Sequence, residues 1–316
     1  MTDTVAAAGY RVRAPAHDDA DAVVELVGAI EEAEFGEAEM TAGDLLAEWS
    51  RPGFRLDTDA WLVTAPDGMP AGYADVHYGR GRAFVSPSTG VHPDHTGMGI
   101  GSRLLGLLVE RGTEMTHAAT DDPTNRRCIT HILGAANPFT DTLRRRGFEE
   151  TKRHWTMRID MQDRPATPRW PDGVGVRSFE PGRDDETIYR LVQTAFDDIE
   201  DREWSPYEEW RVYLIDRDDF DPGLWFVAEA DGEIVGCALA VAYPTEGWIR
   251  QLAVRRDARG RGVGTALLEE AFGGLYDRGE RRAGLGMAAA NATAKRLYER
   301  AGMYVNQEFV EYDLRV

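Results

Sequence analysis

The chain contains an internal repeat, and this repeat limits the possible folds more than any other feature. The dipeptide Asp67–Gly68 returns as Asp231–Gly232, and the segment Val91–Leu105 returns as Val254–Leu268, each after 163 or 164 positions. Matching turns, apolar runs and glycine loops at one nearly constant spacing indicate a duplicated domain. A chain of 316 residues has room for two such domains.

A proline-rich segment separates the two copies. Residues 164–173 contain Pro165, Pro168 and Pro171 and few apolar side chains, which is typical of a linker. Residues 1–163 therefore form the first predicted domain and residues 174–316 the second. In the second copy, the apolar periodicity predicts a strand, two helices, three strands, a glycine loop, a helix, a strand, a helix and a last strand. The first copy follows the same order as far as the helix after its own glycine loop.

The glycine loop of the second copy predicts a phosphate-binding site. The apolar run Ile249–Val254 leads into this loop, which opens directly into an apolar-periodic helix. Backbone N–H groups at the start of such a helix converge on one point and carry a partial positive charge. Full positive charges come from Arg255, Arg256, Arg259 and Arg261.

Two common phosphate-binding motifs do not fit this loop. A P-loop requires a Gly-Lys pair, which the chain lacks. A dinucleotide fingerprint requires the spacing GxGxxG at the opening of a doubly wound unit. Here the glycines are Gly260, Gly262 and Gly264, and the loop follows a hairpin.

A third family fits better. The residues Arg259–Gly264 match the R/Q-x-x-G-x-G/A pyrophosphate loop of the GCN5-related N-acetyltransferases, the GNAT superfamily. The segment Asn291–Met303 resembles a second motif of the family, N-x-x-A-x-x-L-Y-x-x-x-G-F/M. The resemblance covers most of residues 172–316 and, more weakly, residues 10–161. It implies an α+β fold of two tandem GNAT domains, each a mixed, mostly antiparallel sheet flanked by helices.

The resemblance also implies the chemistry. Acetyl-CoA would be the cosubstrate, and its acetyl group would pass to a primary amine of a small molecule by direct attack. Tyr298 corresponds to the tyrosine that protonates the departing thiolate as general acid. The residues expected to bind the coenzyme, on a splayed strand, the loop and two helix starts, are Leu252, Ala253, Val254, Arg259, Gly260, Arg261, Gly262, Val263, Gly264, Thr265, Asn291 and Tyr298.

The catalytic base is less clear. All seven histidines precede the linker, so the second copy is expected to use a carboxylate, a chain of waters, or no base. Glu246, just before the splayed strand, is the candidate; a solvated turn residue is the competing interpretation. The acidic run at residues 197–201 fits the attraction of a cationic amine, but an ordinary solvated loop is the favoured interpretation.

The first copy lacks the residues that would do this chemistry. Thr96 and Met98 stand in place of the two arginines of the loop, and aligning the asparagine motifs places Arg144 at the position of Tyr298. Arginine remains protonated and is a poor general acid. We therefore expect a non-catalytic first domain that is structural or shapes the substrate site.

Composition excludes several other classes. The net charge of −19 leaves no basic surface for nucleic acid. Cys128 and Cys237 give no disulfide framework, and His92 and His95 lack further ligands for a metal. No signal peptide or apolar run of membrane length is present. We expect a cytoplasmic protein without a metal or a membrane partner, as a monomer or a homodimer.

Two alternatives to a general small-molecule N-acetyltransferase stay open. Tandem chains of this length with a silent first half also resemble the mycothiol synthases, which acetylate an amino sugar–cysteine conjugate. That family carries a glutamate where this chain has Trp248. From a different class, the chain fits a regulatory module that binds acyl-CoA without turnover, although the intact Tyr298 argues against that function.

Overall fold

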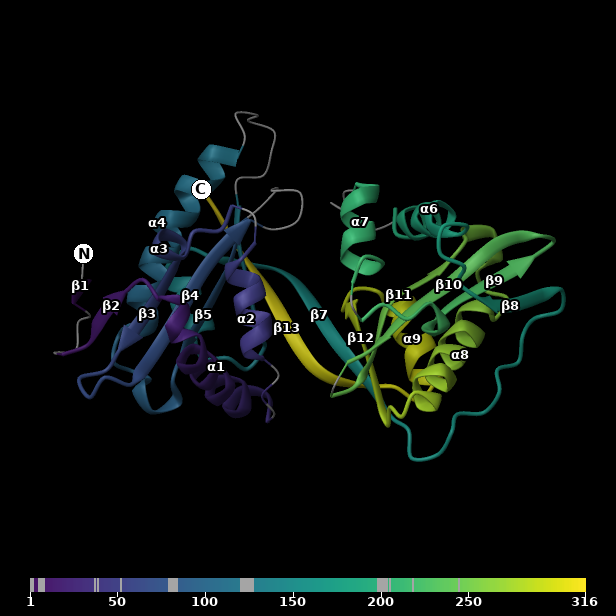
Figure 1. Ribbon diagram of the computed structural model, residues 1–316, viewed down its shortest axis with the longest axis horizontal. Helices are drawn as coiled ribbons and strands as arrows, with labels where there is room; N and C mark the ends of the chain where they lie inside the picture. Colours follow the sequence, from purple (N-terminus) through teal and green to yellow (C-terminus); the bar gives the residue numbers. More distant parts are fainter. Residues whose placement is uncertain are drawn as a thin grey trace. The chain divides into compact units, whose positions relative to one another are not determined.

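Two units with the same architecture make up the structure, a computed structural model (Figure 1). It describes all residues except 1–2, 5–8, 37, 39, 52, 79–84, 120–127, 198–203, 205, 218 and 244. Unit 1 comprises residues 1–152 and 309–316, and unit 2 comprises residues 153–308.

In unit 1, neighbouring strands pair in sequence order, antiparallel throughout except for the parallel pair β5 and β6. The strands are β1 (Asp3–Thr4), β2 (Arg11–Arg13), β3 (Ala60–Thr64), β4 (Pro70–Tyr78), β5 (Val85–Val91) and β6 (Cys128–Gly134). The helices are α1 (Ala20–Phe35), α2 (Ala42–Trp49), α3 (Leu56–Asp59), α4 (Ile100–Ala119) and α5 (Thr140–Arg145), with the 3-10 turns η1 (His17–Asp19) and η3 (Pro93–His95).

Helices cover both faces of the unit 1 sheet because its strands alternate apolar side chains to both sides. On one face, Val63 and Val76 pack against α4 through Leu104 and Leu108. On the other face lie α1 and α2, whose buried residues Val23, Leu26, Leu45 and Trp49 contact Leu62 and Tyr73.

Unit 2 repeats this plan. Its strands are β8 (Val174–Ser178), β9 (Trp225–Ala230), β10 (Glu233–Ala242), β11 (Gly247–Val254) and β12 (Arg282–Ala288), with parts of β7 (Glu149–Asp160) and β13 (Tyr304–Arg315). They pair antiparallel from β8 to β11, and β11 and β12 are parallel. The helices are α6 (Asp185–Ala195), α7 (Tyr207–Leu214), α8 (Val263–Asp277) and α9 (Ala292–Arg300), with the 3-10 turns η4 (Pro222–Leu224) and η5 (Arg256–Ala258).

The two faces of the unit 2 sheet have different partners. Ala238 and Ala240 of β10 face α8 and α9, in a cluster with Leu267 and Phe272. Their neighbours Cys237 and Leu239 face α6 and α7, in a separate cluster with Ile188 and Trp210. Figure 1 shows α6 and α7 on one side of this sheet and α8 and α9 on the other. The predicted duplicated α+β fold with helix-flanked, mostly antiparallel sheets is confirmed.

Each sheet is completed by a strand from the other repeat. Residues 309–315 of β13 pair antiparallel with β6 in unit 1, in the register Tyr312↔His131. Residues 154–160 of β7 pair antiparallel with β12 in unit 2, in the register Arg158↔Gly284. The predicted boundaries at 163 and 174 follow the repeats along the chain, whereas the compact units follow this exchange of terminal strands.

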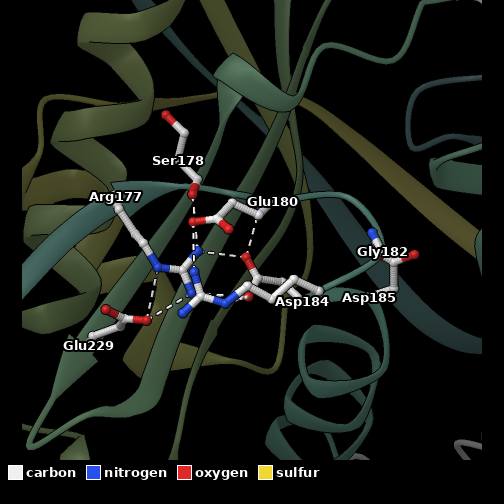
Figure 2. A network of polar contacts seen from close by, with 8 residues as sticks. Arg177, Ser178, Glu180, Gly182, Asp184, Asp185 and Glu229 are labelled. Atoms are coloured by element: carbon white, nitrogen blue, oxygen red, sulfur yellow. Dashed lines mark hydrogen bonds and ion pairs between the residues drawn. The ribbon is translucent and has the colours of Figure 1, made fainter.

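A pair of matching ion-pair networks also shows the duplication. In unit 2, Arg177 donates to Asp184 at 2.6 and 2.9 Å and pairs with Glu229 at 2.7 Å, while the amide of Glu180 donates to Asp184 (Figure 2). Burial raises the pKa of Asp184, but these hydrogen bonds outweigh it and hold the pKa below its ordinary value. In unit 1, Arg13 donates to Asp19 at 2.6 and 2.7 Å in the same place before the first helix.

Candidate active site

Every residue predicted to bind the coenzyme or to act in catalysis lies in unit 2. Leu252, Ala253 and Val254 end β11, and residues 259–262 form the loop that follows. Val263, Gly264 and Thr265 form the first turn of α8. Asn291 caps α9, which carries Tyr298, and Glu246 immediately precedes β11.

An open strand edge lies at the centre of this region. In their described stretches, β11 and β12 pair only at Gly247↔Ala283 and Trp248↔Gly284, so the two strands separate from Ile249 onwards. Unpaired backbone N–H groups at such an edge are strong hydrogen-bond donors that require a partner. The splay that the resemblance implied is therefore present in the structure.

The direction of the edge amides follows from the pairing of β11 with β10. The amide of Arg255 donates to the carbonyl of Val235 at 2.8 Å. Because successive amides of a strand point to opposite edges, the amide of Ala253 also points toward β10. The amides of Leu252 and Val254 point to the open edge instead. Two of the three predicted amides are thus directed into the gap.

The glycines of the loop have two different roles. Gly260 and Gly262 adopt left-handed conformations, with φ of 75° and 95°, which glycine adopts without strain. Gly264 instead permits close packing, since a Cβ there would lie 3.1 Å from Cδ1 of Leu297. With glycine at its N-cap, α8 receives no side-chain cap. Its first amides are therefore available to an anion.

The arginines of the loop differ in what they contact. Arg259 donates to the carbonyls of Ala195, at 2.7 Å, and Val254, at 3.1 Å, and so ties the loop to α6 and β11. Arg255 pairs with Asp257 at 2.7 Å. Arg261 is exposed and forms no hydrogen bond or ion pair with any residue that the structure describes. Arg261 is thus the loop arginine most available to a phosphate.

A cavity of about 740 Å³ lies beside the start of α8. One wall consists of Gly262, Thr265, Ala266 and Glu269 of α8, and the other consists of residues 159–169, which include part of the linker. The linker is fixed against α8 by Arg164, which pairs with Asp277 at 2.9 Å. The predicted loop residues Gly262 and Thr265 therefore line an open pocket.

Tyr298 is buried, with 9% of its surface exposed. Burial raises the pKa of its hydroxyl to about 12, so the phenol is protonated at neutral pH. The hydroxyl forms no hydrogen bond with a described residue. Asn291 accepts a hydrogen bond from the amide of Ala294 at 3.0 Å, and this N-cap leaves its side-chain NH₂ group for other partners.

Glu246 is held by an ion pair. Its side chain is buried, and Oε2 lies 2.9 Å from Nε of Arg158 on β7. Proton transfer to Glu246 would require this pair to break. Arg158 belongs to the first repeat along the chain, and only the exchange of strands brings it into unit 2. No local sequence signal indicates a strand pairing of this kind.

Unit 1 retains the glycine loop, but side chains bridge the gap between its two equivalent strands, β5 and β6. Gly97 and Gly99 have φ of 76° and 80°, close to their counterparts in the second copy. In their described stretches, β5 and β6 pair only at Val85↔Ile129. Beyond that point, Nε2 of His131 lies 3.2 Å from Oγ1 of Thr89, so two side chains bridge the strands. Burial lowers the pKa of His131 to about 4, which keeps this bridge neutral.

The structure also corrects one alignment. The amide of Met303 donates to the carbonyl of Tyr298, and in the first copy the amide of Phe148 donates in the same way to Leu143. Leu143, which is fully buried, therefore stands at the position of Tyr298. Arg144 is wrong for that position because the first copy is one residue shorter between the asparagine and the glycine of this motif.

Among the described residues, no group of three or more histidine, cysteine, aspartate or glutamate side chains is placed to hold a metal ion. In the same part of the chain, no helix has both the length and the apolar character needed to cross a bilayer. Of the acidic run at 197–201, residues 198–201 lie outside the described part.

The open β-strand edge followed by a glycine loop at a helix start defines an acetyltransferase of the GNAT class. The Acetyltransferase (GNAT) family model matches residues 21–130 and 186–303, once in each repeat. The chain belongs to this family, and it is an acyl-CoA-dependent N-acetyltransferase with two GNAT domains.

The chain is similar over most of its length to several known proteins. A mycothiol acetyltransferase from Actinosynnema mirum is 28% identical, with 94% of this chain and 98% of the relative covered. One from Thermomonospora curvata is 31% identical, with 81% and 83% covered. The crystal structure of a GCN5-related N-acetyltransferase from Sphaerobacter thermophilus superposes with a TM-score of 0.86 at 34% identity, covering 98% of this chain and 96% of the other.

Proposed function

We propose that unit 2 carries the active site and transfers an acetyl group from acetyl-CoA to a primary amine of a small molecule. The observation that carries this proposal is the difference between the two units. Unit 2 combines an open strand edge, an uncapped helix start and the unbonded hydroxyl of Tyr298. Unit 1 has a bridged gap and Leu143 at the equivalent position.

The residues of unit 2 fit acetyl-CoA along its length. The first amides of α8, with Arg261 and the Thr265 hydroxyl, would hold the pyrophosphate. The side-chain NH₂ of Asn291 would donate to the pantetheine arm. The amides of Leu252 and Val254 at the open edge supply donors for the pantetheine and for the thioester oxygen, where negative charge develops.

The reaction needs one proton donor and one acceptor. The neutral amine attacks the carbonyl carbon, and the carbon–sulfur bond of the tetrahedral intermediate breaks. The departing thiolate takes the proton of the Tyr298 hydroxyl, which is protonated at neutral pH, and the resulting phenolate regains a proton from water before the next turnover. The proton lost by the amine passes to water or to a carboxylate. Glu246 is a candidate for that role only if its ion pair with Arg158 opens.

A second candidate function is the acetylation of an amino sugar–cysteine conjugate. The relatives named mycothiol acetyltransferase favour it, since one of them covers nearly the whole chain. Trp248 argues against it. This residue occupies the glutamate position of that family, and its ring lies 2.6 Å from where a Cβ of Gly284 would be. The indole thus covers the sheet where the family has a carboxylate.

The test is thiol release from acetyl-CoA over a panel of amines that includes the amino sugar–cysteine conjugate. We expect Tyr298→Phe to lower kcat by about 10²- to 10⁴-fold while acetyl-CoA still binds. Tyr276→Phe is the matched control, because it removes a phenol elsewhere in the same unit. If Tyr298→Phe retains kcat within about threefold, the general acid is misassigned. Binding without turnover of any amine would instead favour a regulatory module.

A further inference from the structure

Arg250 lies at an irregularity in the strand that borders the active site. The register of β10 and β11 shifts between Leu239↔Gln251 and Ala240↔Ile249, which leaves Arg250 without an opposite residue. Its guanidinium carbon lies 5.0 Å from the ring centre of Tyr213 and 5.4 Å from that of Tyr243. It also donates a hydrogen bond to the Tyr243 hydroxyl. Two tyrosines therefore fix the guanidinium in place.

The partly buried charge of Arg250 forms no ion pair within the part of the chain that the structure describes. Other half-buried arginines of unit 2 are paired: Arg158 with Glu246, and Arg177 with Asp184 at 2.6 Å. None of the described carboxylates forms an ion pair with Arg250. The hydrogen bonds of Arg217 hold the pKa of Asp219 below its ordinary value, and the charge of Arg250 adds to this effect without a direct contact.

This lack of a partner is informative in so acidic a protein. The chain has 55 acidic and 36 basic side chains, so carboxylates are in excess. Removing a charge from water without a counter-ion is costly, and natural proteins pair such charges. Among the described residues, Arg250 donates a hydrogen bond to the Tyr243 hydroxyl alone, and two aromatic rings hold its side chain in place. Such an arrangement suits an anionic ligand, because guanidinium binds oxyanions with two parallel hydrogen bonds.

Arg250 lies on β11, the same strand whose amides face the open edge, so an anion bound by Arg250 would be near the proposed site of acetyl transfer. The strand edge opens at Ile249, and Leu252, whose amide faces the gap, follows Arg250 by two residues. Two residues of a strand span roughly 6.6 Å. The contact with Tyr213 of α7 places the Arg250 side chain on the α6–α7 face of the sheet. An anionic group bound by Arg250 would therefore lie on the α6–α7 side of the strand that forms the open edge.

We propose that the acceptor is a zwitterion: a primary amine that also carries a carboxylate or phosphate, which Arg250 binds while the amine attacks the thioester. This inference rests on the proposed function, since it describes the acceptor of the same site. The anionic group is unchanged by the reaction and serves only to orient the amine. Arg250 is thus a specificity-determining residue and takes no part in proton transfer.

Matched acceptors provide the test. L-alanine, L-phenylalanine and L-glutamate are each compared with their α-amide and their decarboxylated amine, and phosphoethanolamine is compared with ethanolamine. We expect kcat/KM for at least one anionic member to exceed that of its neutral partner by about ten- to a hundredfold. Arg250→Gln should reduce this preference to within about threefold, mainly through KM, and Arg250→Lys should retain part of it. Arg190→Gln, at an exposed arginine of α6 paired with Glu186, is the control and should change nothing.

The outcomes separate this inference from the proposed function. If neutral amines react as well as the acids, or if Arg250→Gln keeps the preference, the inference is wrong and the acetyltransferase assignment stands. If no amine is acetylated, the proposed function fails, and titration of the same acids into the acetyl-CoA-saturated protein decides the inference. If the wild type binds one of these acids and Arg250→Gln does not, the result supports an anion site at Arg250. If the wild type binds none of them, the anion site is refuted. Unchanged acetyl-CoA binding by Arg250→Gln shows that the variant is folded.

Discussion

Leu143 occupies in the first repeat the position that Tyr298 occupies in the second. Each residue accepts, through its main-chain carbonyl, a hydrogen bond from the amide five residues later, at 3.1 Å and 3.0 Å. Both side chains are buried. One copy has thus filled with a leucine the place where the other carries its proposed general acid. The two repeats thus share a backbone hydrogen bond here and differ in the side chain beside it.

The bridged gap of unit 1 predicts how much acetyl-CoA the protein binds. Because His131 and Thr89 span the strands where the coenzyme would insert, we expect one acetyl-CoA per chain by isothermal titration calorimetry. Gly264→Trp, which fills the close contact between α8 and α9, should abolish that binding. Gly101→Trp at the equivalent place in unit 1 should leave one site. A stoichiometry of two would show that the bridge opens.

Arg261 is expected to contribute more to coenzyme binding than its neighbours. Arg261→Gln should raise the Kd for acetyl-CoA by about tenfold, which is the loss of one charge-assisted hydrogen bond. Arg255 already pairs with Asp257, so Arg255→Gln removes the same charge from the same loop with a smaller effect. Dephospho-CoA and CoA should be affected alike, because the pyrophosphate is common to both. Equal effects of the two substitutions would show that only the net charge matters.

The raised pKa of Tyr298 predicts the alkaline behaviour. With the folded pKa near 12 and an ordinary value of 10, the phenol stays neutral in the folded protein while the unfolded chain ionises. Tyr298 therefore costs no stability below pH 10 and destabilises the fold progressively between about pH 10 and 12. Chemical denaturation of the wild type and of Tyr298→Phe across this range measures the difference. Identical pH dependence would mean that burial does not shift this group.

Glu246 is expected to matter more for stability than for catalysis. Glu246→Gln removes the charge opposite Arg158 inside the protein, and we expect a loss on the order of 2 kcal/mol in the free energy of unfolding. The value of kcat should change by less than about threefold if water takes the amine proton. A much larger fall in kcat at normal stability would establish Glu246 as the base. Arg158→Gln should then fail to reproduce that fall.

Local sequence patterns define the candidate site of the second repeat more fully than the equivalent region of the first. The glycine loop, the asparagine cap and Tyr298 are all encoded by residues close together in the chain, and the structure places all of them in unit 2, where their roles stay predictions. The leucine at the tyrosine position was missed because one residue is absent before it. The bridge between Thr89 and His131 could not be foreseen, since it joins two strands 42 residues apart.

The exchange of strands was beyond the reach of repeat analysis for a physical reason. A repeat in the sequence specifies which elements form, but each terminal strand has equivalent apolar edges available in both copies. The choice between them depends on pairings that span more than a hundred residues, as between β6 and β13. For the same reason the sequence did not assign Arg158 to unit 2, although Arg158 contacts Glu246 there.

The exchanged strands have a consequence for synthesis of the protein on the ribosome. The sheet of unit 1 is completed by residues 309–315, which emerge long after the rest of that unit. Until then β6 is an uncovered edge that can pair with other chains. A gene fragment that encodes only residues 1–163 would lack the strand that covers this edge in the full chain. Each repeat therefore depends on the other to complete its sheet, and the two fold together as one chain.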